Sequence, residues 1–229
     1  RQNLLDGHSS RSMILDLIRG QIDKFVDTFL DPNYGVESLA SYAGSQLDCQ
    51  LEPRDFINMD FQMASDYAHD QAERQAEVTA AEIVEENLPE DMEEEWNWKA
   101  LAHWANSRQG ANYQEHQLKK MERDELIDAL IEKSHARIAG VKLDEGAVML
   151  ESDFGLRTLS AWMHHKFGLE TTPEEFRDVE DRREVADALY QRAEESYTAK
   201  EAEYPVLTGI SRFTEKQGAQ VSLDREGLV

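Results

Sequence analysis

Residues 9–30, which read SSRSMILDLIRGQIDKFVDTFL, carry the clearest fold signal in this chain. Apolar side chains recur there at the three- and four-residue intervals of an α-helix, at Met13, Ile14, Leu17, Ile18, Ile22, Phe25, Val26, Phe29 and Leu30. Ser9 or Ser10 is suited to cap this helix, and Asp31-Pro32 is expected to end it. The stretch therefore predicts one long helix of roughly 30 Å whose apolar stripe packs against a core.

The remainder of the chain shows the same helical period. The whole chain has only 5 proline and 12 glycine residues among 229, and it lacks the alternating pattern of β-strands. We therefore expect an all-α fold, with a long scaffold helix followed by tandem pairs of helices. The longer helices of these pairs are predicted at residues 53–84, 123–139 and 181–202. The sequence Thr172-Pro173-Glu174-Glu175 has the order of a capping box before the last of them.

One spacing occurs three times along the chain: an aromatic residue, four residues, leucine, two residues and a second aromatic residue. The three copies are Tyr34/Leu39/Tyr42, Trp96/Leu101/Trp104 and Phe154/Leu159/Trp162. They lie 62 and then 58 residues apart (96 − 34 and 154 − 96). Self-similarity at such a period is typical of helical repeat proteins, in which neighbouring units stack to bury their apolar faces.

The repeated spacing divides the chain into segments. We expect the start of a helical scaffold at residues 1–31, followed by helical units at residues 32–95, 96–150 and 151–204. Residues 205–229 are predicted to form a linker and the start of a fourth unit, because Leu223 and Leu228 repeat the spacing between the first aromatic residue and the leucine. Since the sequence begins with Arg1 and stops inside this unit, we expect a fragment.

The charge of the chain excludes several classes of partner. With 24 Lys and Arg against 47 Asp and Glu, the net charge is −23 at pH 7. A surface this acidic repels the phosphates of nucleic acids, and it argues against direct binding to an anionic membrane. The uncharged apolar stretches are far shorter than the roughly 18 residues of a membrane-spanning helix. Cys49 is the single cysteine, so we expect no internal disulfide and a reducing compartment.

No motif in the sequence identifies an active site. The acidic run at residues 85–95 lacks the alternating ligands and turn glycine of a calcium loop, which favours an inter-helix linker over a metal site. His164 and His165 are adjacent, so on a helix they point about 100° apart and cannot readily share one ion. Acidic neighbours of Cys49 are expected to raise its pKa. We therefore expect no catalytic, cofactor-binding or metal-binding residues in this segment.

Aromatic residues are the remaining candidates for function. A groove for an extended polypeptide is one interpretation of the set Tyr34, Tyr42, Trp96, Trp98, Trp104, Phe154 and Trp162. Most of them keep register with a leucine, which favours the inter-helix core of each unit instead. Trp98 stands outside that register. We therefore single out Trp98 as the candidate contact for a partner.

Two parts of the sequence resemble the SecA family of bacterial preprotein translocase motors. Residues 1–30 are similar to the point where the family's helical scaffold leaves the second nucleotide-binding domain: an arginine, a Leu-acidic-Gly sequence, then a long helix with Ile/Leu pairs. The later units resemble the helical wing domain, whose opening Trp-Asp-x-x-Gly-Leu is degenerate at residues 96–101 and clearer at 223–228. The family carries one wing unit, whereas this chain carries three and the start of another.

The resemblance implies a non-catalytic scaffold and wing segment of an ATP-driven protein-export motor. The parent protein would be a translocase that uses ATP and Mg, in the cytoplasm and peripherally on the inner membrane. Its partners would be the rest of the motor, the translocon and the preprotein. The family's ATPase motifs have no counterpart here, so the resemblance implies no cofactor for this segment. The alternative is an independent acidic helical-repeat adaptor that binds other proteins.

Overall fold

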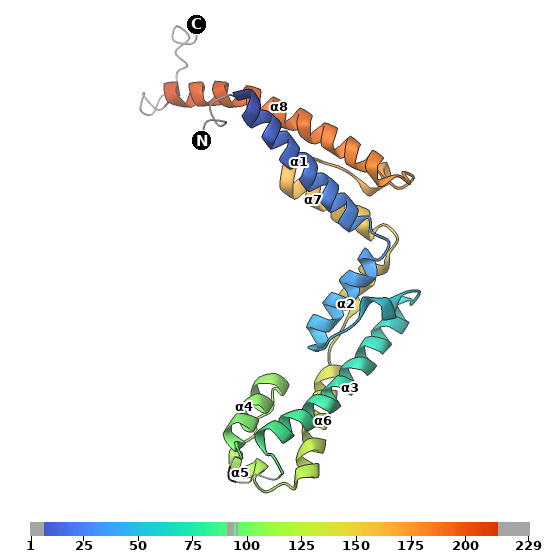
Figure 1. Cartoon of the computed structure of the whole chain (residues 1–229), viewed down its shortest axis with the longest axis vertical. Coiled ribbons are helices and arrows are strands. Elements are labelled where there is room, and N and C mark those ends of the chain that lie inside the picture. Colours follow the sequence, from blue (N-terminus) through green and yellow to red (C-terminus); the bar gives the residue numbers. More distant parts are fainter. Residues whose placement is uncertain (1–6, 91–93, 95, 215–229) are drawn as a thin grey trace. The chain divides into compact units, whose positions relative to one another are not determined.

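The structure is a computed structural model that describes residues 7–90, 94 and 96–214, with side chains described for residues 11–90, 94 and 96–203. All regular structure in these ranges is helical, which confirms the all-α prediction. The α-helices are α1 Gly7–Phe29, α2 Tyr34–Leu47, α3 Phe61–Asn87, α4 Trp98–Gln109, α5 Glu115–Leu118, α6 Arg123–Ala139, α7 Phe154–Phe167 and α8 Arg182–Thr214 (Figure 1). Short 3-10 helices lie at η2 Pro53–Phe56, η4 Asp144–Leu150 and η5 Pro173–Glu175. Within the described ranges, no helix is both long and apolar enough to cross a membrane.

The chain divides into two compact units, residues 1–31 with 155–229 and residues 32–154. In the first unit α1 lies along α8, and α7 packs against both (Figure 1). The core of this unit takes residues from all three helices: Ile22, Val26, Leu159, Met163, Phe176, Val185, Ala186, Leu189 and Ala193. The aromatic ring of Trp162 adds to this core, with its centroid 4.4 Å from that of Phe25.

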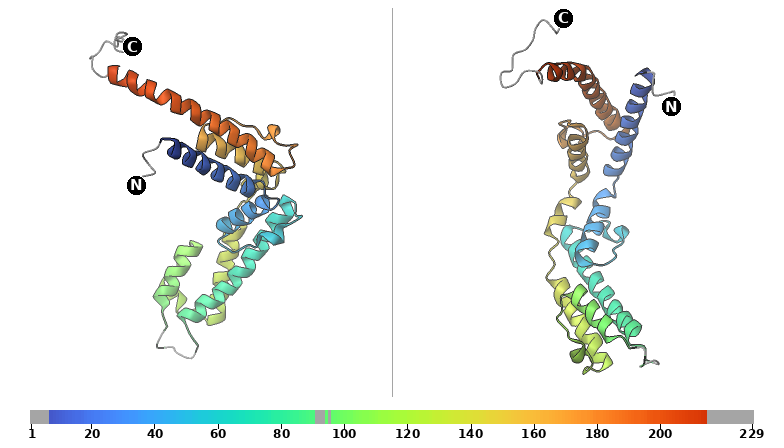
Figure 2. Two further views of the ribbon diagram at one scale, coloured as in Figure 1. Left: turned by 45° about the horizontal axis from the view of Figure 1, so that its top comes forward. Right: turned by 90° about the vertical axis from the view of Figure 1, so that its left-hand side faces the viewer.

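The second unit is built around α3 and α6, which lie side by side (Figure 2). Helix α2 packs against α3, η2 and η4, and helix α4 packs against α3, α5 and α6. Two apolar cores follow from this arrangement. The first is centred on Leu39, Leu47, Phe56, Ala68 and Ile138, and the second on Val84, Leu101, Leu118, Leu126 and Leu130.

One succession of elements occurs three times: a short helix, a short helical turn and a long helix. The three copies are α2–η2–α3, α4–α5–α6 and α7–η5–α8. Leu39, Leu101 and Leu159 are at most 2% exposed, so the register leucines are core residues as predicted. Each short helix is followed by a residue with left-handed φ, at Asp48, Gly110 and Gly168. Each middle turn brings one large side chain into the core: Phe56 and Leu118 are the last residues of η2 and α5, and Phe176 directly follows η5.

The first half of α1 differs from the prediction, because its apolar side chains are exposed. Met13 is 53% exposed and Leu17 is 64% exposed, whereas Ile22 and Val26 are buried. Near its start α1 makes polar contacts with α8 instead, where an Arg11 Nη2–H group donates to Thr198 Oγ1 at 2.9 Å. The helix also begins at Gly7, so the two serines expected to cap it lie inside it.

Two of the predicted long helices have different boundaries. The helix expected at residues 53–84 is interrupted after η2, because Asn58 adopts a left-handed φ of 64°. Asp60 then caps α3, with its Oδ1 accepting from the Met63 N–H group at 2.9 Å. The last helix continues past Pro205 to Thr214, whereas the prediction ended it at residue 202. Helix α6 covers the predicted residues 123–139.

Two smaller predictions concern the third copy and the end of the chain. The capping box is present, since the Thr172 N–H group donates to Glu175 Oε1 at 3.0 Å. It closes the short turn η5, however, and the long helix α8 begins seven residues after Glu175 (182 − 175). Leu223 and Leu228, on which the fourth unit was predicted, lie outside the described residues. The division into units at the predicted boundaries therefore stays a prediction.

Candidate functional site

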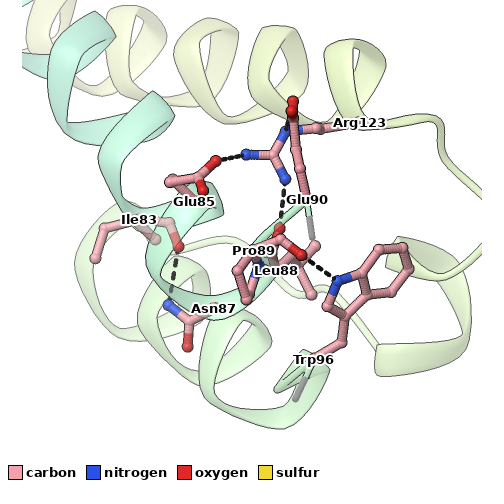
Figure 3. A network of polar contacts seen from close by, with 8 residues as sticks. All are labelled: Ile83, Glu85, Asn87, Leu88, Pro89, Glu90, Trp96 and Arg123. Carbon is pink, nitrogen blue, oxygen red and sulfur yellow. Dashed lines mark hydrogen bonds and ion pairs between the residues drawn. The ribbon is translucent and has the colours of Figure 1, made fainter. Parts of the chain in front are cut away.

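The connection from α3 to α4 is held by hydrogen bonds near its two ends. The Asn97 N–H group donates to the Asn87 carbonyl at 2.8 Å, and Asn97 Oδ1 caps α4 by accepting from the Ala100 N–H group at 3.0 Å. The indole Nε1–H of Trp96 donates to the Pro89 carbonyl at 2.9 Å (Figure 3). These bonds fix the Trp96 ring beside the end of α3.

A pocket of about 340 Å³ opens beside this connection. Its lining is aromatic and apolar in one part and charged in another: Leu88, Glu90, Trp96, Trp98, Lys119, Met121, Glu122, Arg123 and Leu126. The Trp96 and Trp98 rings meet edge to face, with centroids 5.6 Å apart and planes at 80°. Tryptophan, methionine and arginine are enriched at protein interfaces, so this tryptophan pocket is the candidate functional site.

The exposure of the two tryptophans is the reverse of what the sequence pattern indicates. Trp98 was singled out as the exposed residue, but it is partly buried and packs against the core around Leu101 and Leu118. Trp96 was expected in the core by its register, but it is 36% exposed. The reason is local, because α4 begins at Trp98 and the helical spacing does not extend back to Trp96. Whether Trp98 contacts a partner stays a proposal.

Arg123 links the end of α3 to the start of α6. Its guanidinium donates to the Leu88 carbonyl and to the Glu85 carboxylate, and its Nε lies 3.6 Å from Glu90 (Figure 3). The side chain is only 27% exposed. Sequence reasoning missed this residue, because its partners lie 35 and 38 positions away and no local pattern marks the contact.

Replacement of Arg123 by alanine is expected to destabilise the second unit by about 1–3 kcal/mol. The substitution leaves the partly buried Leu88 carbonyl without this donor, and it removes a more exposed charge-assisted bond to Glu85. Arg123→Lys should recover only part of the lost stability, since one ammonium group cannot reproduce the planar, multidentate guanidinium group of arginine. Urea unfolding of the whole chain measures these differences.

Arg177→Ala is the matched control for the Arg123 substitution. Arg177 is 57% exposed and pairs with Glu174 at 3.4 Å, a surface contact that contributes little. Its replacement should leave the unfolding midpoint unchanged within error. If the Arg123 and Arg177 variants have equal unfolding midpoints, the contacts of Arg123 between α3 and α6 contribute nothing to the free energy of unfolding.

A second, smaller pocket of about 220 Å³ lies among α2, α3, α4 and α6. Its polar lining groups form bonds between helices of the second copy of the repeated motif and between the first and second copies. The buried Gln109 amide donates to Ser134 Oγ at 2.9 Å and to the Leu130 carbonyl at 3.1 Å. Arg108 pairs with Asp48 at 2.7 Å. The Gln109 amide nitrogen and the Arg108 guanidinium are thus used in contacts between helices.

The residues judged inert from the sequence lie in ordinary surroundings. Burial raises the pKa of the Cys49 thiol, and the Asp48 carboxylate adds to the effect against the opposing charge of Arg137. The direction agrees with the prediction, but burial is the larger cause. His164 Nδ1 lies 2.9 Å from Glu170 in an exposed pair. Among the residues with described positions, no group of three or more His, Cys, Asp or Glu side chains is placed to hold a metal ion.

Comparison with known proteins identifies one strong relative. The chain is 68% identical over all 229 residues to protein translocase subunit SecA 1 of Rhodopirellula baltica. It spans only 18% of the length of that protein. No family model matches the chain, and no solved structure matches it. The match includes every copy of the repeated motif.

Proposed function

Because this chain belongs to the SecA family, we propose that it is the non-catalytic helical scaffold and wing segment of an ATP-driven motor that moves preproteins through a translocon. The observation that carries the proposal is the match to a SecA protein along the whole chain. Residues 1–31 would be the start of the scaffold, and the units at residues 32–95, 96–150 and 151–204 would form an enlarged wing. On this proposal the segment transmits motion and does not hydrolyse ATP.

The packing of the first unit supports a mechanical role. Arg19 of α1 pairs with Asp187 of α8 at 2.6 Å, and its guanidinium lies 5.4 Å from the Tyr190 ring centroid. Hydrogen bonds to Asp187 and to Asp23 raise the pKa of Arg19 above its ordinary value. Together with the shared apolar core, these contacts make α1, α7 and α8 one body, as a lever requires.

The remaining properties of the proposed parent motor belong outside this segment. ATP and Mg would bind to its nucleotide-binding domains, and the motor would act in the cytoplasm and at the inner membrane. Its partners would be the translocon and the preprotein. A net charge of −23 on this segment supports placing contacts with anionic lipid elsewhere in the motor.

The complete reading frame and an ATPase assay test the proposal together. We expect the frame upstream of residue 1 to encode a Gly-x-x-x-x-Gly-Lys-Thr phosphate loop. The purified chain should release no phosphate from ATP above the buffer rate, whereas the complete protein should. ATP turnover by the chain alone would contradict the non-catalytic role. A frame without nucleotide-binding domains would favour the adaptor alternative.

One observation fits the alternative of an independent adaptor, namely the tryptophan pocket. An adaptor needs a surface that recognises other proteins, and Trp98 with its neighbour Trp96 provides aromatic anchors for one. Such a surface also suits an enlarged wing, so the pocket alone does not separate the two functions. The reading frame separates them.

A further inference from the structure

Two indole rings, those of Trp96 and Trp98, line one part of the tryptophan pocket. The Nε1–H group of Trp96 is already used by the Pro89 carbonyl, so this ring can contact a ligand through its carbon atoms and π surface. The Trp98 ring stands at 80° to it, which gives two aromatic walls. Such walls attract apolar groups and, through the negative face of the rings, cations.

The charges around the pocket favour a cation over an anion. Two carboxylates and two bases line it, and both bases already have acidic partners: Lys119 lies 3.8 Å from Glu115, and Arg123 contacts Glu85. The lining charges and these partners sum to 2 − 4 = −2 (Lys119 and Arg123; Glu85, Glu90, Glu115 and Glu122). An anionic ligand would be repelled here.

The sequence next to the pocket strengthens this preference. Residues 85–95 contain seven acidic residues and no basic one, and they end directly before Trp96. The whole chain carries a charge of −23. A field of this sign raises the rate at which a basic partner arrives, and a specific pocket then holds it.

The size of the pocket limits the occupant. A volume of about 340 Å³ is at the lower end of the range for small-ligand sites, so it fits one long side chain better than a cofactor. Lysine and arginine have an apolar stem and a cationic end. Met121 and Leu126 suit the stem, while the two rings and Glu90 suit the charge.

We propose that the tryptophan pocket binds a lysine or arginine side chain in a basic segment of a partner polypeptide. Trp96 and Trp98 form the aromatic walls, and Glu90 and Glu122 supply the opposing charge. The inference rests on the pocket alone and goes beyond the assignment to an export motor. It holds equally for a wing and for an adaptor.

Fluorescence anisotropy of labelled peptides with the whole chain tests this proposal. The three probes are twelve-residue peptides of one Gly/Ser sequence that carry four lysines, four norleucines or four glutamates. We expect the lysine peptide to bind at least tenfold more tightly than the other two. Trp96→Ala, which changes no charge, should weaken the lysine peptide at least tenfold. Glu90→Gln should weaken it several-fold.

Two control variants separate the pocket from the general charge of the chain. Glu180→Gln removes an exposed carboxylate in the first unit, and Met63→Ala removes an apolar side chain that is 55% exposed on α3. Neither should change the affinity more than twofold. Circular dichroism of the Trp96 variant should match the parent chain, which shows that a loss of binding is not a loss of fold.

Three results would overturn the proposal. Equal binding of the lysine peptide to the parent chain and to Trp96→Ala would show unspecific attraction to an acidic surface. Tighter binding of the norleucine peptide would show an apolar pocket without charge preference. Displacement of the lysine peptide by vesicles of phosphatidylcholine at equal accessible cation concentration would assign the pocket to a lipid headgroup.

Discussion

Replacement of Gly155 by alanine is expected to lower the melting temperature of the first unit by about 15 °C. An added Cβ atom at this position would lie 2.1 Å from the Phe29 carbonyl oxygen. The obstacle is backbone, so no change of rotamer relieves it, and the first turn of α7 must move away from the end of α1. We expect a cost of about 3 kcal/mol, which corresponds to a shift of this size for a unit of roughly 100 residues.

The same contact occurs at the equivalent place in the second unit. An added Cβ at Gly35 would lie 2.3 Å from the Met149 carbonyl oxygen. Both glycines are the second residue of their helix, and both pairs are related by the same offset (155 − 35 = 120 and 149 − 29 = 120). Gly35→Ala should therefore destabilise the second unit by a similar amount.

Gly20→Ala is the control for both glycine substitutions. Gly20 lies inside α1 with no atom within 4 Å of an added Cβ, so alanine should stabilise the helix by about 0.5–1 kcal/mol. Thermal melts followed by tryptophan fluorescence, with phenylalanine in place of Trp96, Trp98 and Trp104 in every variant, report on the first unit, because Trp162 is then the remaining tryptophan and lies in that unit. If Gly155→Ala raises the melting temperature as Gly20→Ala does, the close approach to Phe29 does not exist in solution.

The sequence predicts those parts of the fold that depend on local period and on repetition. Leu39, Leu101 and Leu159 were assigned to the core from spacing alone, and all three are buried. Helix α6 covers the predicted residues, because an acidic first turn and a glycine after its end mark both boundaries. The aromatic/Leu/aromatic spacing occurs three times, and a prediction from a repeated spacing is more reliable than one from a single occurrence.

Features that depend on distant parts of the chain could not be predicted. The apolar stripe of α1 shows which residues share a face, but not how far a partner helix extends along it, and so the exposure of Leu17 was missed. The ring of Trp96 is placed by a bond to the Pro89 carbonyl, outside any helix. Arg123 joins two helix ends that are far apart in the sequence. The helical spacing of apolar residues in the sequence gives no information on these contacts.

Replacement of Leu101 by alanine is expected to destabilise the second unit by about 2–5 kcal/mol. Leu101 is fully buried in the core with Val84, Leu118 and Leu130, so the substitution loses apolar burial and leaves a cavity. Leu39→Ala should have a cost in the same range, and so should Leu159→Ala in the first unit. Urea unfolding followed by circular dichroism measures the three values.

The comparison among these leucines tests whether the three copies of the motif are physically equivalent. Leu17→Ala is the control, since Leu17 is 64% exposed on α1 and its loss should cost less than about 0.5 kcal/mol. The cores are separate, so the Trp162 transition should shift with Leu159→Ala and remain in place with Leu101→Ala. A Leu101 variant as stable as the Leu17 variant would contradict both its place in the core and its equivalence to Leu39 and Leu159. Large losses of stability on substitution of all three leucines would instead mean that the three copies pack in the same way, each with its own leucine in the core.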